Sequence, residues 1–348
     1  MNRSSQVTGG GPHEAAERER RLLAREEAPA TAGVSRRTFL RRAGAGAGAV
    51  VVGAGGVGYR VYDNGVFSTG DGTAYDAWRE WERGEGPAAL VAAAVLAPNP
   101  HNSQAWAFRV SDDQIDLFAD RNRPTGALDP FGRELQVGLG AALENLLLAA
   151  PAHGYGARLR LQPTAGEPVH AARVELSGGP RQAGALYRAI PHRHTDRSRY
   201  DGRPVPAADL AAMSALADGL PHARVRWFSA PAQLRRIGAL MVSAAAAVTR
   251  IVTVPDARDD AQRMTGGRLL QRIHLWTAAN GLSLQHMNQI TERADRERQL
   301  DLAPRFGDAI QALVPAGTEP LAAFRIGYPR NDDGRRLSPR RPAAEVIA

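Results

Sequence analysis

The sequence predicts an α+β fold, in which helices and strands are mixed rather than strictly alternating. Apolar residues recur at helical spacing, most clearly at Leu135, Leu139 and Leu143. Residues 106–110 and 114–118 instead alternate around a short polar turn, which is typical of a β-hairpin. Because such segments follow one another without a repeating strand-helix-strand unit, we expect α+β rather than parallel α/β architecture.

In the first half, helices are expected over residues 75–83 and 88–96, the second ending at Pro98. After the hairpin, Asp129 is expected to cap a long helix that has Pro130 at its first position and runs to about residue 150. Strands are expected next, at residues 157–161 and 171–176.

The second half is expected to begin with helices over residues 181–190 and 207–216 and a strand over 223–228. A helix-rich region should extend from residue 232 to residue 298, and it includes a helix over 270–280 that Gly281 ends. A strand at 322–327 closes the body.

The N-terminal region carries features of export. Residues 1–34 are polar and charged and are expected to be disordered, whereas residues 35–60 contain Arg36-Arg37 followed by an uncharged, glycine-rich core. Paired arginines before a short apolar core indicate a twin-arginine signal, which serves proteins that are exported already folded. The core is short for a membrane span, so either cleavage or an uncleaved anchor is compatible with it.

The same core contains a G-x-G-x-x-G pattern, from Gly53 to Gly58. In a dinucleotide-binding domain a helix opens on the last glycine and a second strand ends in an acidic residue about 20 positions on. Gly65, Gly70 and Gly72 interrupt any such helix here. We therefore interpret the run as the apolar core of the signal, with dinucleotide binding as the less favoured alternative.

Composition excludes several classes of function. The formal net charge is +8, but without residues 1–60 the chain holds 34 basic and 31 acidic residues, so nucleic-acid binding is not indicated. Lysine and cysteine are absent, which excludes Schiff-base chemistry, a standard P-loop, disulfides and thiolate metal sites. Any phosphate group must be held by arginine, hydroxyls or backbone amides.

A proline-rich loop at residues 97–106 is the first candidate site. If its prolines hold it extended, Asn102 and Gln104 lie on one side and can hydrogen-bond a planar heteroaromatic ring. The alternative is a structural loop packed by Trp106.

Arg193-His194-Thr195-Asp196-Arg197 is the second candidate, because two arginines and a hydroxyl in five residues suit a phosphate group. A solvated surface segment is the alternative. His192 and His194 alternate like metal ligands, but no partner ligands accompany them, so no metal site is expected.

The third candidate combines Gly281-Leu282-Ser283-Leu284 with the C-terminal Ser338-Pro339-Arg340-Arg341. Taken alone, either segment could be structural. Backbone amides near Ser283 and Leu284 can face a ligand, and the two arginines can close over a phosphate.

In this order the motifs resemble the FMN-binding nitroreductase family, whose members have an Arg-x-Ser/Thr-x-Arg/Lys phosphate loop, a flavin loop ending in Asn-x-Gln-Pro-Trp and a basic C-terminal pair. Here Ala97, Asn99 and Ala105 depart from the flavin loop. The phosphate loop follows the flavin loop, whereas it precedes it in ordinary members. The chain is therefore similar to the duplicated, Acg-type branch, in which one chain carries two nitroreductase-like halves.

The resemblance implies halves at residues 75–180, with the flavin loop, and 181–345, with the phosphate loop. They would form a pseudo-dimer within a monomer, with one FMN. Arg193, Thr195, Arg340 and Arg341 would hold its phosphate, and His194 belongs to the same motif. Asn102, Gln104 and the segment at Ser283-Leu284 would contact the rest, with Arg197 near the flavin N1 edge as the residue that tunes it.

No catalytic side chain is implied, since the reaction takes place at flavin N5. Two functions remain open: an oxidoreductase that passes electrons to nitro compounds or quinones, or a protein that stores FMN. A lipid-surface or structural module is a weaker third. NAD(P)H is the family's electron donor, yet an exported protein would not meet it. A cytoplasmic location is the alternative to export by the twin-arginine machinery.

Overall fold

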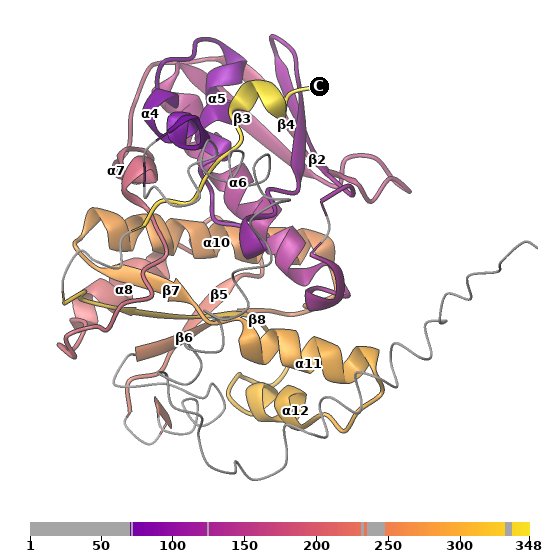
Figure 1. Ribbon diagram of the computed structural model, residues 1–348, viewed down its shortest axis with the longest axis vertical. Coiled ribbons are helices and arrows are strands. Elements are labelled where there is room, and N and C mark those ends of the chain that lie inside the picture. Colours follow the sequence, from indigo (N-terminus) through magenta and orange to yellow (C-terminus); the bar gives the residue numbers. More distant parts are fainter. Residues whose placement is uncertain (1–69, 71, 124, 231–232, 235–247, 331–335) are drawn as a thin grey trace, which may run out of the picture. The chain divides into compact units, whose positions relative to one another are not determined.

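The computed structural model describes residues 70, 72–123, 125–230, 233–234, 248–330 and 336–348. Their backbone confirms the predicted α+β class: helices accompany two antiparallel sheets of four strands each (Figure 1). The predicted N-terminal tail and twin-arginine segment lie outside the described residues. Residues 62–348 form one compact unit.

The first sheet has the strand order β1-β2-β4-β3. Its strands are β1 (Trp106–Val110), β2 (Gln114–Ala119), β3 (Tyr155–Leu161) and β4 (His170–Gly178), all paired antiparallel. The β1–β2 hairpin is the predicted one, because Trp106, Phe108, Ile115 and Leu117 alternate toward a buried core. All four strands were therefore predictable from their sequence pattern.

Short helices accompany the first sheet. They are α4 (Asp76–Glu80), α5 (Pro87–Ala94) and α7 (Ala185–Arg188), with 3₁₀ turns at Thr73–Tyr75, Pro100–Asn102, Gly126–Leu128 and Ile190–His192. The helix predicted over residues 181–190 is therefore much shorter than expected. Pro191 accounts for its end, since it allows only the 3₁₀ turn that follows.

The long helix α6 (Arg133–Ala152) begins later than predicted. Asp129 does cap it, since its carboxylate accepts hydrogen bonds from the amides of Glu134 and Leu135 at 3.1 and 2.8 Å. Pro130, however, lies before the helix, because Gly132 adopts a left-handed conformation at φ 68° and starts the helix there. By length and composition α6 could cross a membrane, but 72% of its most apolar window is buried, which is typical of a core helix.

The second sheet has the order β5-β6-β8-β7, the same arrangement as the first. Its strands are β5 (Arg224–Trp227), β6 (Val248–Val254), β7 (Ser283–His286) and β8 (Glu319–Gly327). The described helices around it are α8 (Ala207–Ala215), α10 (Asp260–Ala279), α11 (Gln289–Gln299) and α12 (Arg305–Gln311). A last 3₁₀ turn spans Ala343–Glu345.

The prediction of a helix-rich region from residue 232 to residue 298 is wrong in two places. β6 and β7 both lie within it. Residues 251–254 read Ile-Val-Thr-Val, a β-branched run that favours a strand. β7 is too short to show a period of its own, and only its pairing with β8 makes it a strand.

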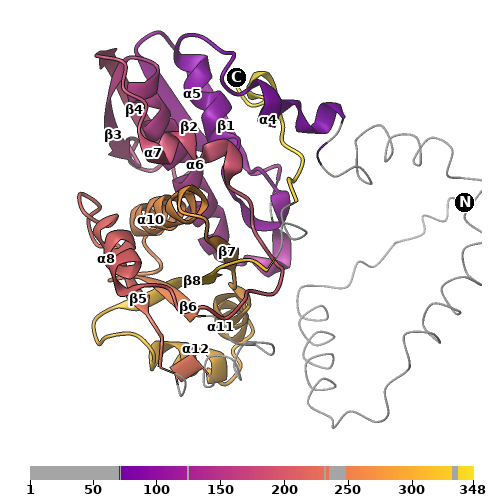
Figure 2. The ribbon, with the colours of Figure 1, turned by 90° about the vertical axis from the view of Figure 1, so that its left-hand side faces the viewer.

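The two halves meet along α6 and α10, which lie side by side in both views (Figures 1 and 2). Glycines allow the close approach: a Cβ atom on Gly140 of α6 would lie 2.1 Å from the carbonyl oxygen of Met264, and one on Gly267 of α10 would lie 2.2 Å from that of Val137. The contact is therefore reciprocal, with each helix backbone pressed against a glycine of the other.

The C-terminal segment returns to the first half (Figure 1, yellow). The amide of Phe108 donates to the carbonyl of Val346, and the amide of Arg340 donates to that of Ala74, at 2.7 and 3.0 Å. Val346 is buried in the core of the first half. This return brings Ser338 and Arg340 beside the proline-rich loop.

Candidate functional site

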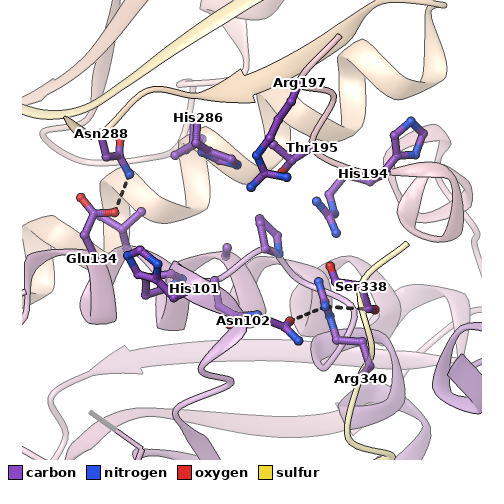
Figure 3. Close-up of a pocket in the computed structure, with 18 of the residues that line it drawn as sticks. His101, Asn102, Glu134, His194, Thr195, Arg197, His286, Asn288, Ser338 and Arg340 are labelled. Carbon is purple, nitrogen blue, oxygen red and sulfur yellow. Dashed lines mark hydrogen bonds between the residues drawn. The ribbon is translucent and has the colours of Figure 1, made fainter. Parts of the chain in front are cut away.

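A cavity of about 360 Å³ lies where both halves and the C-terminal segment meet (Figure 3), a size within the range of ligand sites. Its wall comes from the proline-rich loop, α6, the segment 193–197, α10, the region from the end of β7 into α11, and residues 336–340. The residues that line it are Trp78, Pro98, Asn99, Pro100, His101, Asn102, Glu134, Val137, Gly138, Ala141, Arg193, His194, Thr195, Arg197, Leu270, His286, Asn288, Gln289, Glu292, Arg336, Leu337, Ser338 and Arg340.

The proline-rich loop is not extended, which corrects the sequence-based expectation. His101, Asn102 and Gln104 have φ values of 49°, 55° and 49°, a region that residues other than glycine rarely adopt. The turn is held from within, since Asn99 Oδ1 accepts from the amide of Gln104 at 2.8 Å. Strain of this kind persists where surrounding contacts fix it, and it often marks a ligand site.

The sequence-based expectation placed Asn102 and Gln104 on one side of an extended loop. Because the loop turns, the two side chains instead point to different partners. Asn102 lines the cavity and accepts a hydrogen bond from Arg340 Nη1 at 2.6 Å. Gln104 is buried away from the wall, and its Oε1 accepts from the backbone amide of Arg341 at 2.7 Å. Gln104 therefore positions the C-terminal segment.

Arg193 and Arg340 form the basic end of the cavity and are only 2% and 4% exposed. Their guanidinium carbons lie 5.8 and 5.2 Å from the ring centroid of Trp78. Arg193 Nη2 donates to the carbonyl of Leu96 and Arg340 Nη2 to that of Ala97, both at 3.1 Å. Among the described residues neither guanidinium meets a carboxylate, and both Nε atoms are buried without a hydrogen-bond partner.

The electrostatics of this end follow from that burial. Burial lowers the pKa of Arg193 well below its usual value, and the nearby charge of Arg340 lowers it further. Burial also lowers the pKa of Arg340, to about 10. Two buried cations without a counter-ion are costly unless an anion binds between them. Their forked donors suit a phosphate group.

The segment 194–197 also lies at the basic end, and its backbone is held in place by β7. Thr195 and Leu284 form a β-bridge, and the amide of Asp196 donates to the carbonyl of Leu284 at 3.0 Å. Burial acts to raise the pKa of Asp196, but hydrogen bonds from Ser198 and Ser283 outweigh it and lower that pKa. Asp196 is therefore an anion that anchors the segment.

Ser283 and Leu284 thus lie behind the segment and are not among the residues that line the cavity. The sequence-based expectation had placed this segment in contact with the bound flavin. His194 is held by His274, whose Nε2 lies 3.0 Å from the His194 carbonyl oxygen. Arg341 also lies off the wall, with its side chain 3.6 Å from Glu345. Of the predicted residues, the structure brings together Asn102, Arg193, His194, Thr195, Arg197 and Arg340 at the cavity.

The opposite end of the cavity is acidic and amide-rich. It contains Glu134 from α6, Asn288 just before α11, and His101 from the loop (Figure 3). Glu292 of α11 also lines the cavity, and its charge acts on Glu134. Burial raises the pKa of Glu134 to about 8, with the charges of Asp129 and Glu292 acting in the same direction. The carboxyl group of Glu134 is therefore mostly uncharged at neutral pH.

His286 lies between these ends, on the side of Arg197 and Asn288 (Figure 3). Burial lowers its pKa to about 3, assisted by the charges of Arg193 and Arg197. Its Nε2 atom is buried without a partner among the described residues. His286 therefore offers a neutral imidazole to the cavity.

Sequence reasoning missed Trp78, Glu134, His286 and Asn288, whereas Ser338 lies in the third candidate segment. Trp78 lies in the helix expected over residues 75–83 and Glu134 in the long helix expected after Asp129, and neither was assigned to a site. His286 ends β7, a strand that was not predicted, and Asn288 lies two residues beyond it. A sequence signal for His286 and Asn288 is that polar residues recur in residues 283–288, after Gly281-Leu282.

No family model matches the chain. It is 36% identical over 149 residues to a protein of Mycobacterium tuberculosis named as an NAD(P)H nitroreductase. The matched residues make up 38% of this chain and 43% of that relative. The acg nitroreductase of the same species is 37% identical over 87 residues, or 25% of this chain and 26% of the relative.

The chain is similar to Acg-type nitroreductases. It spans less than half the length of these curated relatives. Among solved structures, a nitroreductase from Anabaena variabilis covers 73% of this chain and 74% of its own length, with 13% identity and a TM-score of 0.46. A nitroreductase with bound FMN from Bacteroides fragilis covers 48% of this chain and 98% of its own, with 18% identity and a TM-score of 0.37.

Proposed function

We propose that this protein is an FMN-dependent oxidoreductase of the nitroreductase type. The observation that carries the proposal is the pair of buried guanidinium groups, Arg193 and Arg340, which meet no carboxylate among the described residues and leave both Nε atoms unpaired. A phosphate monoester between them would neutralise both charges. The similarity to nitroreductases supports FMN as the molecule that carries this phosphate.

The chain's own residues have separate roles in this proposal. Arg193, Arg340 and Thr195 hold the phosphate group, and Asn102 orients Arg340 through its side-chain oxygen. Arg197 supplies positive charge beside the ring and favours its reduced anion. Bound FMN supplies the electron-transfer chemistry, so no side-chain nucleophile is required.

We also propose that the chain is a monomer with two halves that act as a pseudo-dimer around one FMN. The equal strand orders and the reciprocal helix contact support this proposal. The electron acceptor is a small molecule such as a nitro compound or a quinone, and NAD(P)H is the proposed donor because the relatives carry that name.

Export of the protein and storage of FMN are proposed from the sequence. Export by the twin-arginine route rests on Arg36 and Arg37, which lie outside the described residues. Storage of FMN without turnover is the second candidate function, because an exported protein would not meet NAD(P)H.

The test of the proposal begins with the purified full chain. Its visible spectrum and acid-released flavin should give about one FMN per chain. Arg193→Ala and Arg340→Ala should each weaken FMN binding at least tenfold, because a hydrogen bond to a charged group contributes about 1.5–3 kcal/mol. Arg121→Ala, an exposed arginine off the cavity wall, is the matched control and should bind FMN normally.

Absence of flavin, bound FAD, or two flavins per chain would each contradict the single FMN site. Stopped-flow mixing of the FMN-loaded protein with NADPH separates the two candidate functions. Rapid bleaching of the flavin band supports the oxidoreductase. Bleaching no faster than that of free FMN favours storage.

A further inference from the structure

Trp78 of α4 lies beside both arginines at the basic end of the cavity. It is 7% exposed, and it lines the cavity. The guanidinium carbons of Arg193 and Arg340 lie 5.8 and 5.2 Å from the centroid of its ring. Both distances are within the range of about 6 Å over which the face of an aromatic ring attracts a cation. One indole ring is therefore shared by two guanidinium groups that come from distant parts of the chain.

The indole N–H of Trp78 holds the segment that carries Arg340. Nε1 of Trp78 donates to the carbonyl oxygen of Ser338 at 2.9 Å. The same carbonyl accepts from Arg340 Nη1 at 3.3 Å, and Ser338 and Arg340 lie together at this end of the cavity (Figure 3). The backbone amide of Arg340 donates to the carbonyl of Ala74 at 3.0 Å. Trp78 and the turn before it therefore fix the C-terminal segment where Arg340 reaches the cavity.

The two arginines repel each other when no anion is bound. The charge of Arg340 adds to burial in lowering the pKa of Arg193. Both Nε atoms are buried without a hydrogen-bond partner among the described residues. Repulsion of this kind favours separation of the two side chains. The electron-rich face of Trp78 attracts both guanidinium groups, so it opposes that separation.

We propose that Trp78 is a positioning residue of the phosphate site, whose ring keeps Arg193 and Arg340 together before a phosphate monoester binds and whose N–H seats the segment that carries Arg340. This inference rests on the proposed function, because it names the residue that prepares the same site for the phosphate of FMN. Trp78 acts through the two guanidinium groups and makes no bond to the phosphate itself.

The energetic consequence is confined to the phosphate group. Ordering a long side chain during binding weakens affinity, so arginines that are ordered in advance bind an anion more tightly. Riboflavin has the ring and ribityl chain of FMN but no phosphate, and it needs neither arginine. The ratio of the riboflavin and FMN dissociation constants therefore measures what the two arginines add. A ring that only fills the cavity wall would affect both ligands equally.

The test compares FMN with riboflavin on the full chain after its flavin has been removed, by quenching of flavin fluorescence. Trp78→Leu should bind FMN about tenfold more weakly and riboflavin within about twofold of the wild type, since only the phosphate loses its ordered arginines. Trp78→Phe keeps an aromatic face but loses the N–H, so it should bind FMN about threefold more weakly. Partial recovery by phenylalanine distinguishes a role of the aromatic face from one of apolar volume.

Trp81→Leu is the matched control. Trp81 follows α4 directly, is 5% exposed, packs on Tyr187 at a centroid distance of 5.1 Å, and is not among the residues that line the cavity. This substitution removes the same volume from the same part of the core, and it should keep the wild-type ratio of the two dissociation constants. If Trp78→Leu does not fold, Trp78→Phe against Trp81→Phe makes the same comparison.

Phenyl phosphate, a phosphate monoester without a flavin, separates this inference from the proposed function. Calorimetry should show that Trp78→Leu weakens its binding about tenfold as well. If the chain binds phenyl phosphate in this way but binds no FMN, the proposed function fails and the role of Trp78 stands. If the wild type binds FMN but the Trp78 variants keep its ratio of dissociation constants, or lose FMN and riboflavin equally, the inference is overturned and the proposed function stands. Failure of the wild type to bind either phosphate ester overturns both.

Discussion

At the scale of single residues, the cavity contains charges that the folded chain does not neutralise by itself. Arg193 and Arg340 are buried cations without a carboxylate among the described residues, and Glu134 is a buried carboxyl group whose neighbours are mostly negative. Two buried acids elsewhere are compensated: Glu144 lies between Arg268 and Arg272, and Asp116 meets His170 and Arg173. The charges of Arg193 and Arg340 at the cavity lack such a partner among the described residues, and an anionic ligand can provide one.

Glu134 should make stability depend on pH. Its pKa is about 8 in the folded chain against an ordinary 4.5, so the folded state holds this proton more tightly than the unfolded state does. The free energy of unfolding should therefore fall as pH rises from about 4.5 to 8, by roughly 3–5 kcal/mol from this group.

Urea denaturation of the wild type and Glu134→Gln at about pH 5 and about pH 8 measures this effect. The variant should gain stability relative to the wild type at the higher pH, since it has no proton to lose. Glu85→Gln, at an exposed glutamate that does not line the cavity, should follow the wild type at both pH values. Equal pH dependence in wild type and Glu134→Gln would show that the carboxylate ionises without penalty.

At the scale of elements, close packing of α6 on α10 holds the two halves of the cavity wall together. Glu134, Val137, Gly138 and Ala141 come from α6, and Leu270 from α10. Gly138 and Gly140 by themselves predict close packing of this helix, since glycines within a helix otherwise cost about 1 kcal/mol each. The sequence did not show which glycine meets which backbone.

Gly140→Ala and Gly267→Ala should each destabilise the protein by several kcal/mol. The added Cβ would lie 2.1 or 2.2 Å from a backbone carbonyl oxygen, which cannot move as a side-chain end can. Both variants should also lose FMN, because separation of the helices widens the cavity. Unfolding in urea and flavin content are the measurements.

The control for this packing is Gly307→Ala in α12. A Cβ there would have its nearest neighbours at 3.7 Å, an ordinary contact, and alanine is the better helix former. It should leave stability unchanged or raise it by up to about 1 kcal/mol. Wild-type stability in Gly140→Ala would mean that the two helices can separate without cost.

At the scale of the whole chain, all the residues that line the cavity come from one polypeptide. The first half contributes the proline-rich loop and α6, the second half contributes the segment 193–197 and the start of α11, and the C-terminal segment contributes Arg340. In the proposed pseudo-dimer, one chain completes the wall.

FMN binding should therefore not depend on protein concentration. Light scattering during gel filtration should give the mass of one chain for the FMN-loaded protein. Dilution over about three orders of magnitude at constant free FMN should leave the bound fraction unchanged. Flavin loss on dilution, together with a change from dimer to monomer, would contradict the single-chain site.

The sequence alone determined the α+β class, most elements and part of the site. Helix and strand periods depend on local spacing, so the β1–β2 hairpin, α6 and α8 were predictable. The segment with Arg193 and Thr195 was recognisable because its residue types suit a phosphate group, and that chemistry does not depend on the fold.

Only the tertiary structure decided how these parts meet. Strand β7 owes its state to pairing with β8, a contact distant in sequence that local patterns do not encode. The positive φ values of the proline-rich loop turned Gln104 away from the cavity. The protonation of Glu134 depends on burial and on charges from α11 and the loop before α6, and these act through space rather than along the chain.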